Sequence, residues 1–273
     1  MCTNLWARHH GCWRKRRFEK GLNGAGDMFR SGNPALNQNT FEAPWESEAH
    51  TQMSLEGVAN KTGILLGICV ITAVASWMTL LQNPGLGFLL MIVGVIGGLV
   101  LALVTIFSDK KNAAYTAPLY AGFEGLFLGP ISGMFGVAYE GIVWQAVALT
   151  FGVFLTMLGI YRARLIKPTE NFRIGMSAAI GAVVLIYLVS IISSMFGGGV
   201  PYLHGNGLIG IGFSLVVVVI AALTFVLDFD FIENGVESGA PKHLEWYAAF
   251  GLMVTLIWLY VELLRLLSKI RSR

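Results

Sequence analysis

Long stretches without any charged side chain dominate the chain after residue 61. Residues 62–107 contain no Asp, Glu, Lys or Arg, and residues 174–227 contain none either. Both stretches are much longer than the about 20 apolar residues that a helix needs to cross a bilayer. Gly, Pro and Asn residues, which favour turns, interrupt them at residues 82–85 and 197–206. The pattern therefore predicts several membrane-spanning segments.

Division at these turns predicts an all-α integral membrane protein with seven transmembrane helices. A helix satisfies its own backbone hydrogen bonds in lipid. A closed barrel is excluded, because its strands would alternate polar and apolar residues. The predicted spans are 62–81, 86–107, 114–135, 142–161, 174–196, 207–227 and 245–267. Together they form a membrane domain over residues 62–273.

The first 61 residues have a different, polar composition. They contain a basic run at residues 14–17, the acidic residues Glu42, Glu46 and Glu48, and many Asn and Gly residues. Such a segment buries too little apolar surface to fold, so we predict a largely disordered N-terminal tail. Met28 is a candidate for the true start residue. In that case residues 1–27 are an extension that comes only from the choice of start codon.

Composition supports the bilayer as the principal partner. Of the 273 residues, 55% are hydrophobic and 13% are charged, against roughly 25% charged in a soluble domain. The net charge of +3 is too small to indicate a nucleic-acid partner.

The distribution of basic residues predicts the orientation. The loops at 108–113 and 162–173 contain Lys and Arg, whereas the turns at 82–85 and 197–206 are uncharged. The positive-inside rule therefore predicts a cytoplasmic N-terminus. Seven spans then place the basic C-terminal residues on the far side. Two explanations stay open: the last segment does not cross fully, or the loop signals override the tail.

Glycines at helical spacing occur in two of the predicted spans. Gly94 and Gly98 form one GxxxG motif, and Gly125, Gly129 and Gly133 form a doubled one. Glycine at this spacing lets two helix backbones approach closely in lipid, so we interpret these residues as helix-packing positions. A dimer face and a narrow pathway lined by backbone are the alternatives.

Carboxylates at membrane depth are the candidate functional residues. A charge at the bilayer centre costs at least about 2.5 kcal/mol and is tolerated mainly for function. Glu124 lies in the third span, Asp228 and Asp230 close the sixth, and Glu245 and Glu262 lie in the seventh. Glu245 and Glu262 are about 25 Å apart along one helix, so they cannot share a site.

Two interpretations of Asp228 remain open from the residues alone. Brought near Glu262 or Glu124, it would form a pair of carboxylates that titrates near physiological pH. Alternatively, Asp228, Asp230 and Glu233 form a solvated loop, and Glu262 pairs with Arg265 on its own helix.

Known catalytic and metal-binding patterns are absent from the sequence. No HExxH, Walker or GxSxG pattern occurs, and the histidines do not form a ligand set. We therefore expect no enzyme activity, no bound metal and no cofactor.

Several strings resemble the Bax inhibitor-one (transmembrane Bax inhibitor motif) family, specifically its bacterial branch. The resemblance covers residues 28–273. The strings are MFRSGNPALNQNTF at 28–41, EGLFLGPIS at 124–132 and LDFDFIENGVESGAPKHLEWYAAFGLMVTLIWLYVELLRLL at 227–267.

The resemblance implies a bacterial cell-membrane protein with seven helices, the last one central. It also implies a pH-sensitive calcium leak controlled by facing carboxylates in the sixth and seventh spans. Carried over by position, these are Asp228 and Glu262. The family usually has aspartate where this chain has Glu262, so the side chain of this chain is one methylene longer and the geometry of the pair differs. Asp230 is an additional acid beside the site, where many members have glutamine.

Two functions follow as hypotheses. In the first, the carboxylates share a proton at neutral pH and keep a calcium path shut. Carboxylate oxygens are the ligands that calcium prefers. In the second, the protein modulates another membrane complex such as a quality-control protease, and the carboxylates are structural. Purified protein in liposomes separates the two, because only a leak needs no partner.

Overall fold

A computed structural model describes residues 52–166, 168–196 and 207–272. The long helices are α2 (Leu55–Gln82), α3 (Pro84–Phe107), α4 (Ala113–Ala138), α5 (Ile142–Arg162), α6 (Glu170–Met195), α8 (Leu208–Glu237) and α9 (Leu244–Arg271), with a short 3-10 turn, η2 (Lys110–Asn112), before α4. All seven long helices in these ranges have the length and hydropathy needed to cross a membrane. The predicted all-α class is confirmed. The tail before residue 52 and the turn at 197–206 lie outside the described residues.

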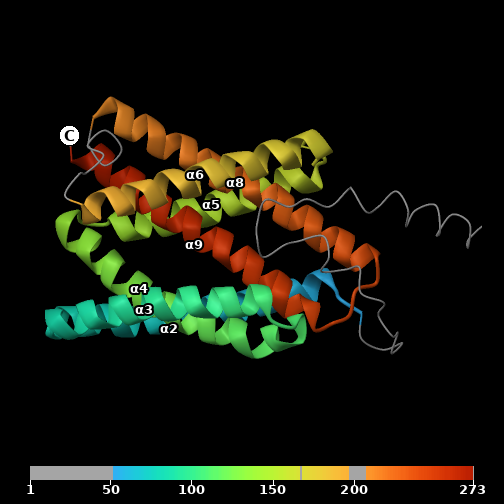
Figure 1. Ribbon diagram of the computed structural model, residues 1–273, viewed down its shortest axis with the longest axis horizontal. Coiled ribbons are helices and arrows are strands. Elements are labelled where there is room, and N and C mark those ends of the chain that lie inside the picture. Colours follow the sequence, from blue (N-terminus) through green and yellow to red (C-terminus); the bar gives the residue numbers. More distant parts are fainter. Residues whose placement is uncertain (1–51, 167, 197–206, 273) are drawn as a thin grey trace, which may run out of the picture.

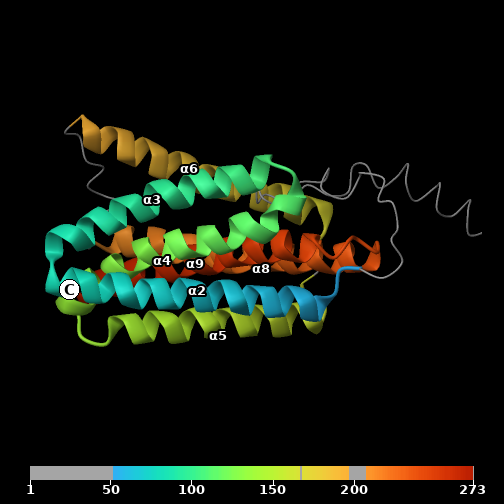
Figure 2. The same ribbon diagram turned by 90° about the horizontal axis from the view of Figure 1, so that it is seen from below.

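The last helix occupies the centre of the bundle. Figure 1 shows α9 between α2, α3 and α4 on one side and α5, α6 and α8 on the other. In the turned view of Figure 2, α9 again lies in the middle, with α3 and α6 above it and α2 and α5 below. Within its membrane window 67% of the residues are buried, against 17% in α2, α3 and α6. Helix α9 packs on α2, α4, α5 and α8, so its central position is confirmed.

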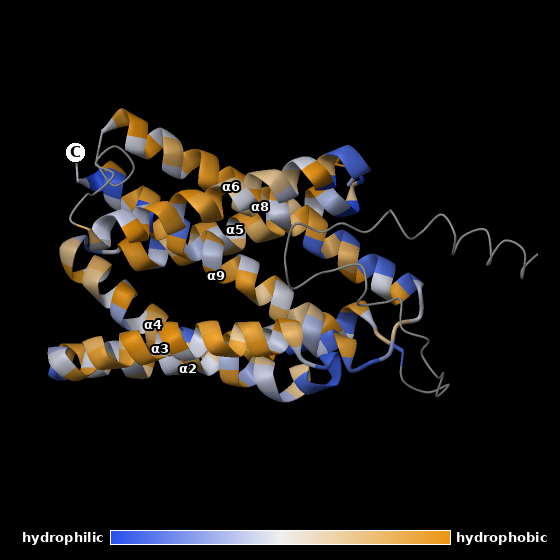
Figure 3. Cartoon of the chain, viewed as in Figure 1, coloured by the Kyte–Doolittle hydropathy of each residue, from blue (hydrophilic) through white to orange (hydrophobic). Residues whose placement is uncertain are grey.

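Hydrophobic residues predominate along the middle of the helices, and hydrophilic residues gather towards their ends (Figure 3). Large apolar residues face outward at mid-helix, for example Ile71 at 71% exposed and Leu99 at 60%. On a soluble protein such a surface would be costly, whereas in a bilayer it faces lipid chains. The protein is therefore an integral, multi-pass membrane protein.

Capping residues explain the sharp turn between α2 and α3. Asn83 ends α2 and also caps α3, because its side chain accepts a hydrogen bond of 3.2 Å from the backbone of Leu86. Pro84 occupies the first turn of α3, where its missing N–H costs nothing. The predicted turn at residues 82–85 is confirmed.

Two helix boundaries differ from the prediction by more than four residues. Helix α2 begins at Leu55 rather than residue 62, because Ser54 caps it by accepting a hydrogen bond from Gly57 N at 3.0 Å. Residues 55–61 of the predicted tail are therefore helical.

Helix α8 continues to Glu237, well past the predicted end at residue 227. The reason is a buried stripe at helical spacing, formed by Asp228, Phe231, Ile232 and Gly235. Asp228 and Asp230 thus lie inside a helix rather than closing it or forming a loop.

The paired glycines lie where helices of this chain meet. A side chain on Gly94 would come within 2.6 Å of the backbone nitrogen of Phe127, so α3 and α4 approach through this position. Side chains on Gly125 and Gly129 would overlap Thr72, Ser76 and the backbone of α2. Gly133 lies against Trp77 and Leu80 of the same helix. These contacts within one chain account for the glycine spacing.

Helix α9 runs the full length of the bundle. At its start, the Glu245 carboxylate pairs with Lys61 near the beginning of α2. At its end, Arg271 donates hydrogen bonds to the Glu140 carbonyl at 2.5 Å and to Gln145 at 2.9 Å, in and just after the α4–α5 connection. Helix α9 therefore reaches from one end of the bundle to the other.

Candidate functional site at the buried carboxylates

A cavity of about 410 Å³ lies inside the bundle at membrane depth. Helices α3, α4, α6, α8 and α9 contribute to its wall, and its polar side chains are Glu124, Tyr120, Thr224 and Thr255. Glu124 and Thr255 each lie about 16 Å along their helices from the same end of the bundle, so they are at the same depth. The cavity therefore brings the α4 carboxylate to the level of the α8–α9 contact.

The surroundings of Glu124 explain why a carboxylate fits there. The α3 residue opposite it is Gly98, and a Cβ at that position would lie 3.1 Å from the carboxylate oxygen Oε1. Tyr120, one turn earlier on α4, interacts with the carboxylate through its hydroxyl. The bare backbone of α3 thus provides the space for Glu124.

Asp228 is fully buried and contacts the last helix through Thr255. The Thr255 hydroxyl donates a hydrogen bond of 2.6 Å to Asp228 Oδ2, and Asp228 is 0% exposed. Because Thr255 also lines the cavity, Asp228 lies directly behind the cavity wall. Thr224, one helical turn from Asp228 on α8, lines the same cavity.

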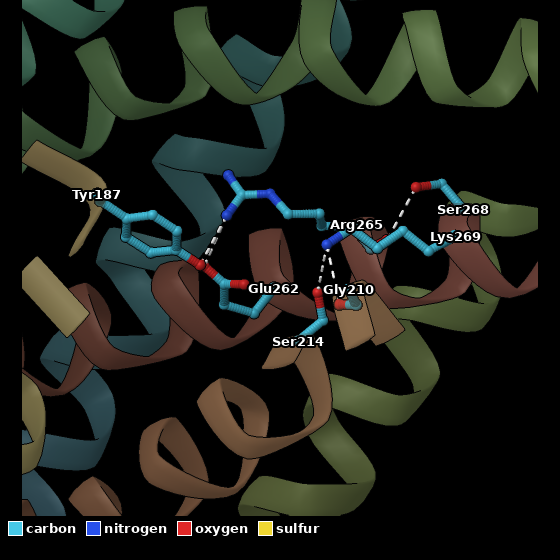
Figure 4. A network of polar contacts seen from close by, with 7 residues as sticks. All are labelled: Tyr187, Gly210, Ser214, Glu262, Arg265, Ser268 and Lys269. Atoms are coloured by element: carbon cyan, nitrogen blue, oxygen red, sulfur yellow. Dashed lines mark hydrogen bonds and ion pairs between the residues drawn. The ribbon is translucent and has the colours of Figure 1, made fainter. Parts of the chain in front are cut away.

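Glu262 belongs to a different network, shown in Figure 4. Its Oε1 accepts a hydrogen bond of 2.8 Å from Tyr187 and one of 3.1 Å from Arg265. Arg265 also donates to the Tyr187 hydroxyl at 2.8 Å and lies over the tyrosine ring. The network joins α6 to α9. Of the two interpretations left open, the pairing of Glu262 with Arg265 on its own helix is the one observed.

The expected hydrogen-bonded pair of Asp228 and Glu262 does not form in the described structure. Glu262 follows Thr255 by seven residues, which places it about 10 Å further along α9. Asp228 therefore contacts α9 at Thr255, about two helical turns before Glu262. Glu262 lies closer to the opposite end of the bundle. The physical reason is the antiparallel α8–α9 hairpin, whose register brings Thr255 to Asp228.

Asp230 also lies outside the cavity wall. Its carboxylate forms an ion pair of 2.5 Å with Arg173 of α6. Nearby, the Tyr161 hydroxyl of α5 donates to Glu233. These contacts fix the end of α8 to α5 and α6, so they have a clear structural role.

Sequence reasoning did not identify three polar residues of the bundle. Thr255 carries a common hydroxyl without a motif, and only the helix register reveals it. Lys269 is buried and donates to the Gly210 carbonyl at 3.1 Å and to Ser214 at 2.9 Å, as Figure 4 shows. The third is Lys61, whose partner Glu245 is 1% exposed. Arg265 and Lys269 thus have hydrogen-bond acceptors inside the bundle. Both lie near the end of the bundle that carries the uncharged turn at residues 82–85.

The described residues contain no group of three or more His, Cys, Asp or Glu side chains that could hold a metal ion. Around the cavity, the oxygen ligands available to a cation are the carboxylates of Glu124 and Asp228 and the nearby hydroxyls.

In the described residues, six membrane-spanning helices surround a buried seventh, and carboxylates lie part-way along the helices. This arrangement is that of a polytopic membrane protein. A model of the Bax inhibitor 1 like family matches residues 33–272, so the chain belongs to this family. No curated protein matches the chain in the corresponding search.

Proposed function

We propose that the protein is a pH-sensitive calcium leak channel whose ion path runs through the cavity beside Glu124. The observation that carries the proposal is the position of two carboxylates, Glu124 in the cavity wall and Asp228 directly behind it. A buried charge at this depth is costly, and it is stabilised when a cation contacts it. Carboxylate and hydroxyl oxygens are suitable ligands for calcium.

The hydrogen bond between Thr255 and Asp228 is the contact that holds the path shut. It joins α8 to α9 at the cavity wall, where a small separation of the two helices would connect the cavity with the polar end of α8. A charge-assisted hydrogen bond is stronger than a neutral one. The protonation state of Asp228 would therefore change how firmly the two helices are held, which links the leak to pH.

Asp228 replaces the pair of carboxylates as the proposed pH sensor. Glu262 contacts Tyr187 and Arg265, and we assign it a structural role. His243 in the α8–α9 connection is a second titratable group to consider. Burial and the nearby Lys111 and Lys61 lower the pKa of His243, so it gains its proton only at a more acidic pH than an ordinary histidine.

Calcium flux through liposomes that contain only the purified protein and lipid tests the proposal. The vesicles enclose a calcium indicator, and flux is followed after calcium is added outside. We expect entry above that of empty vesicles, changed by pH, and reduced several-fold in Glu124→Gln. Glu140→Gln is the control, because Glu140 is exposed in the α4–α5 connection. Flux no higher than in empty vesicles would contradict the proposal and favour modulation of a partner membrane complex.

A further inference from the structure

The cavity has the chemical character of a site for an amphipathic cation. Among the described residues that line it, Glu124 alone carries a charge, and most of the rest are apolar or aromatic. Its volume of about 410 Å³ falls in the usual range for small-molecule sites, which are mainly apolar with a few placed polar groups. An apolar molecule with one cationic group matches this combination of an apolar wall and a single carboxylate.

Aromatic side chains line the cavity together with the carboxylate. Phe127 follows Glu124 by one turn of α4, and Phe250 and Trp258 face the cavity from α9. Aromatic faces attract ammonium groups, most strongly where water is excluded. Glu124 and these rings therefore favour the same kind of ligand.

The cavity is accessible from the lipid side of α3. Val95 and Leu99 line it, and both are exposed on the outer surface, at 47% and 60%. In the bilayer this surface faces acyl chains, so a ligand that partitions into the membrane can reach the cavity laterally.

We propose that this cavity binds a lipophilic primary amine from the bilayer. Its ammonium group pairs with the Glu124 carboxylate, and its apolar body lies between α3 and α9. The bound amine fills the cavity through which calcium would pass and therefore blocks the leak. Only this blocking effect rests on the proposed function; binding itself stands on the geometry of the cavity.

Binding is measured as the ligand-induced rise in the melting temperature of the purified, detergent-solubilised protein, because a ligand of the folded state stabilises it. The probe is 4-phenylbutylamine, which is protonated at neutral pH. The comparison is 4-phenylbutanol, an uncharged molecule of nearly the same shape. We expect a saturable stabilisation by the amine, with an affinity at least about tenfold higher than that of the alcohol, since a charged hydrogen bond is lost.

Glu124→Gln tests the charge and Glu140→Gln is its matched control. In Glu124→Gln the amine should lose its advantage over the alcohol, whereas Glu140→Gln should bind like the wild type. A second variant, Ala102→Leu, narrows the cavity without touching the carboxylate and should weaken both probes. Equal binding of amine and alcohol to the wild type, a retained preference for the amine in Glu124→Gln, or unchanged binding by Ala102→Leu would each overturn the inference.

The flux assay separates this inference from the proposed function. Saturable, Glu124-dependent binding to a protein without any leak would support the amine site and contradict the channel. A second outcome is a calcium leak that 4-phenylbutylamine does not inhibit, together with no shift in melting temperature when the amine is added. That outcome would overturn the amine site alone.

Discussion

The hydroxyl of Thr255 lies 2.6 Å from the carboxylate of Asp228 and joins the central helix to α8 at the wall of the cavity. Both residues are almost fully buried, at 2% and 0% exposed. The contact therefore couples the only described carboxylate behind the cavity to the helix around which the bundle is built. It is the central element of the proposed gate.

Removal of the Thr255 hydroxyl should open the path. In Thr255→Val the shape is kept but the hydrogen bond from Thr255 to Asp228 is lost, so calcium flux at neutral pH should rise several-fold. The free energy of unfolding should fall by about 1 kcal/mol, the usual scale for a hydrogen bond between membrane helices. Thr255→Ser keeps the hydroxyl and should behave like the wild type. Equal flux in all three proteins would show that this contact does not hold the path shut.

Close packing of α2 and α4 should depend on Gly129. A methyl group there would overlap Ser76 and the carbonyl of Ala73, so Gly129→Ala should lower the free energy of unfolding by about 1 to 3 kcal/mol. Gly122 is the control on the same helix, because a Cβ there meets nothing within 4 Å. Gly122→Ala should be neutral or slightly stabilising. Thermal unfolding in detergent measures both, and equal effects would argue against this packing account.

The fold was largely predictable, because hydrophobic spans and turn residues are local signals. The two helix boundaries that differ most from the prediction depend on contacts between residues far apart in the sequence. Helix α2 starts before the predicted residue 62, because Ser54 and Lys61 form hydrogen bonds with Glu245 of α9. Helix α8 continues past the predicted residue 227, because its buried stripe packs inside the bundle.

The candidate site was predictable only in part, for a similar reason. The cost of burying a charge selected Glu124 and Asp228 without any structure, but it selected Asp230, Glu245 and Glu262 as well. Which α9 residue faces Asp228 depends on the length of the α8–α9 connection and on helix register. A position-by-position resemblance selected Glu262, about two turns away from Thr255.

The beginning of α2 should be needed for stability, whereas the first 27 residues should not. Ser54 donates hydrogen bonds of 2.9 Å and 3.1 Å from its backbone and hydroxyl to buried Glu245. A chain that starts at Met28 keeps these contacts and should insert and unfold like the full chain. One that starts at Leu55, with an added Met, loses the cap and should be less stable by about 1 kcal/mol or more. Equal melting temperatures of the two truncated chains would contradict this role of Ser54.

The two ends of the bundle should face opposite sides of the membrane. Asn112 and Ser272 are both exposed and lie at opposite ends of the fold, and the basic loops predict a cytoplasmic position for Asn112. Cysteines are introduced one at a time at these positions, with Cys2 and Cys12 replaced by Ser and the buried Cys69 kept. The two should react differently with an impermeant reagent in intact cells. The Ser272 position should be labelled and the Asn112 position protected. The reverse pattern would invert the predicted orientation.

The most direct test of the central claim is the pH dependence of calcium flux in liposomes, compared between Asp228→Asn and Glu262→Gln. Asparagine cannot titrate but keeps a hydrogen-bonding group of nearly the same shape. We predict that Asp228→Asn remains folded and loses the pH response, whereas Glu262→Gln and His243→Gln retain it. A pH response that is unchanged in Asp228→Asn, or that is lost in Glu262→Gln alone, would contradict a gate built on Asp228 and Thr255.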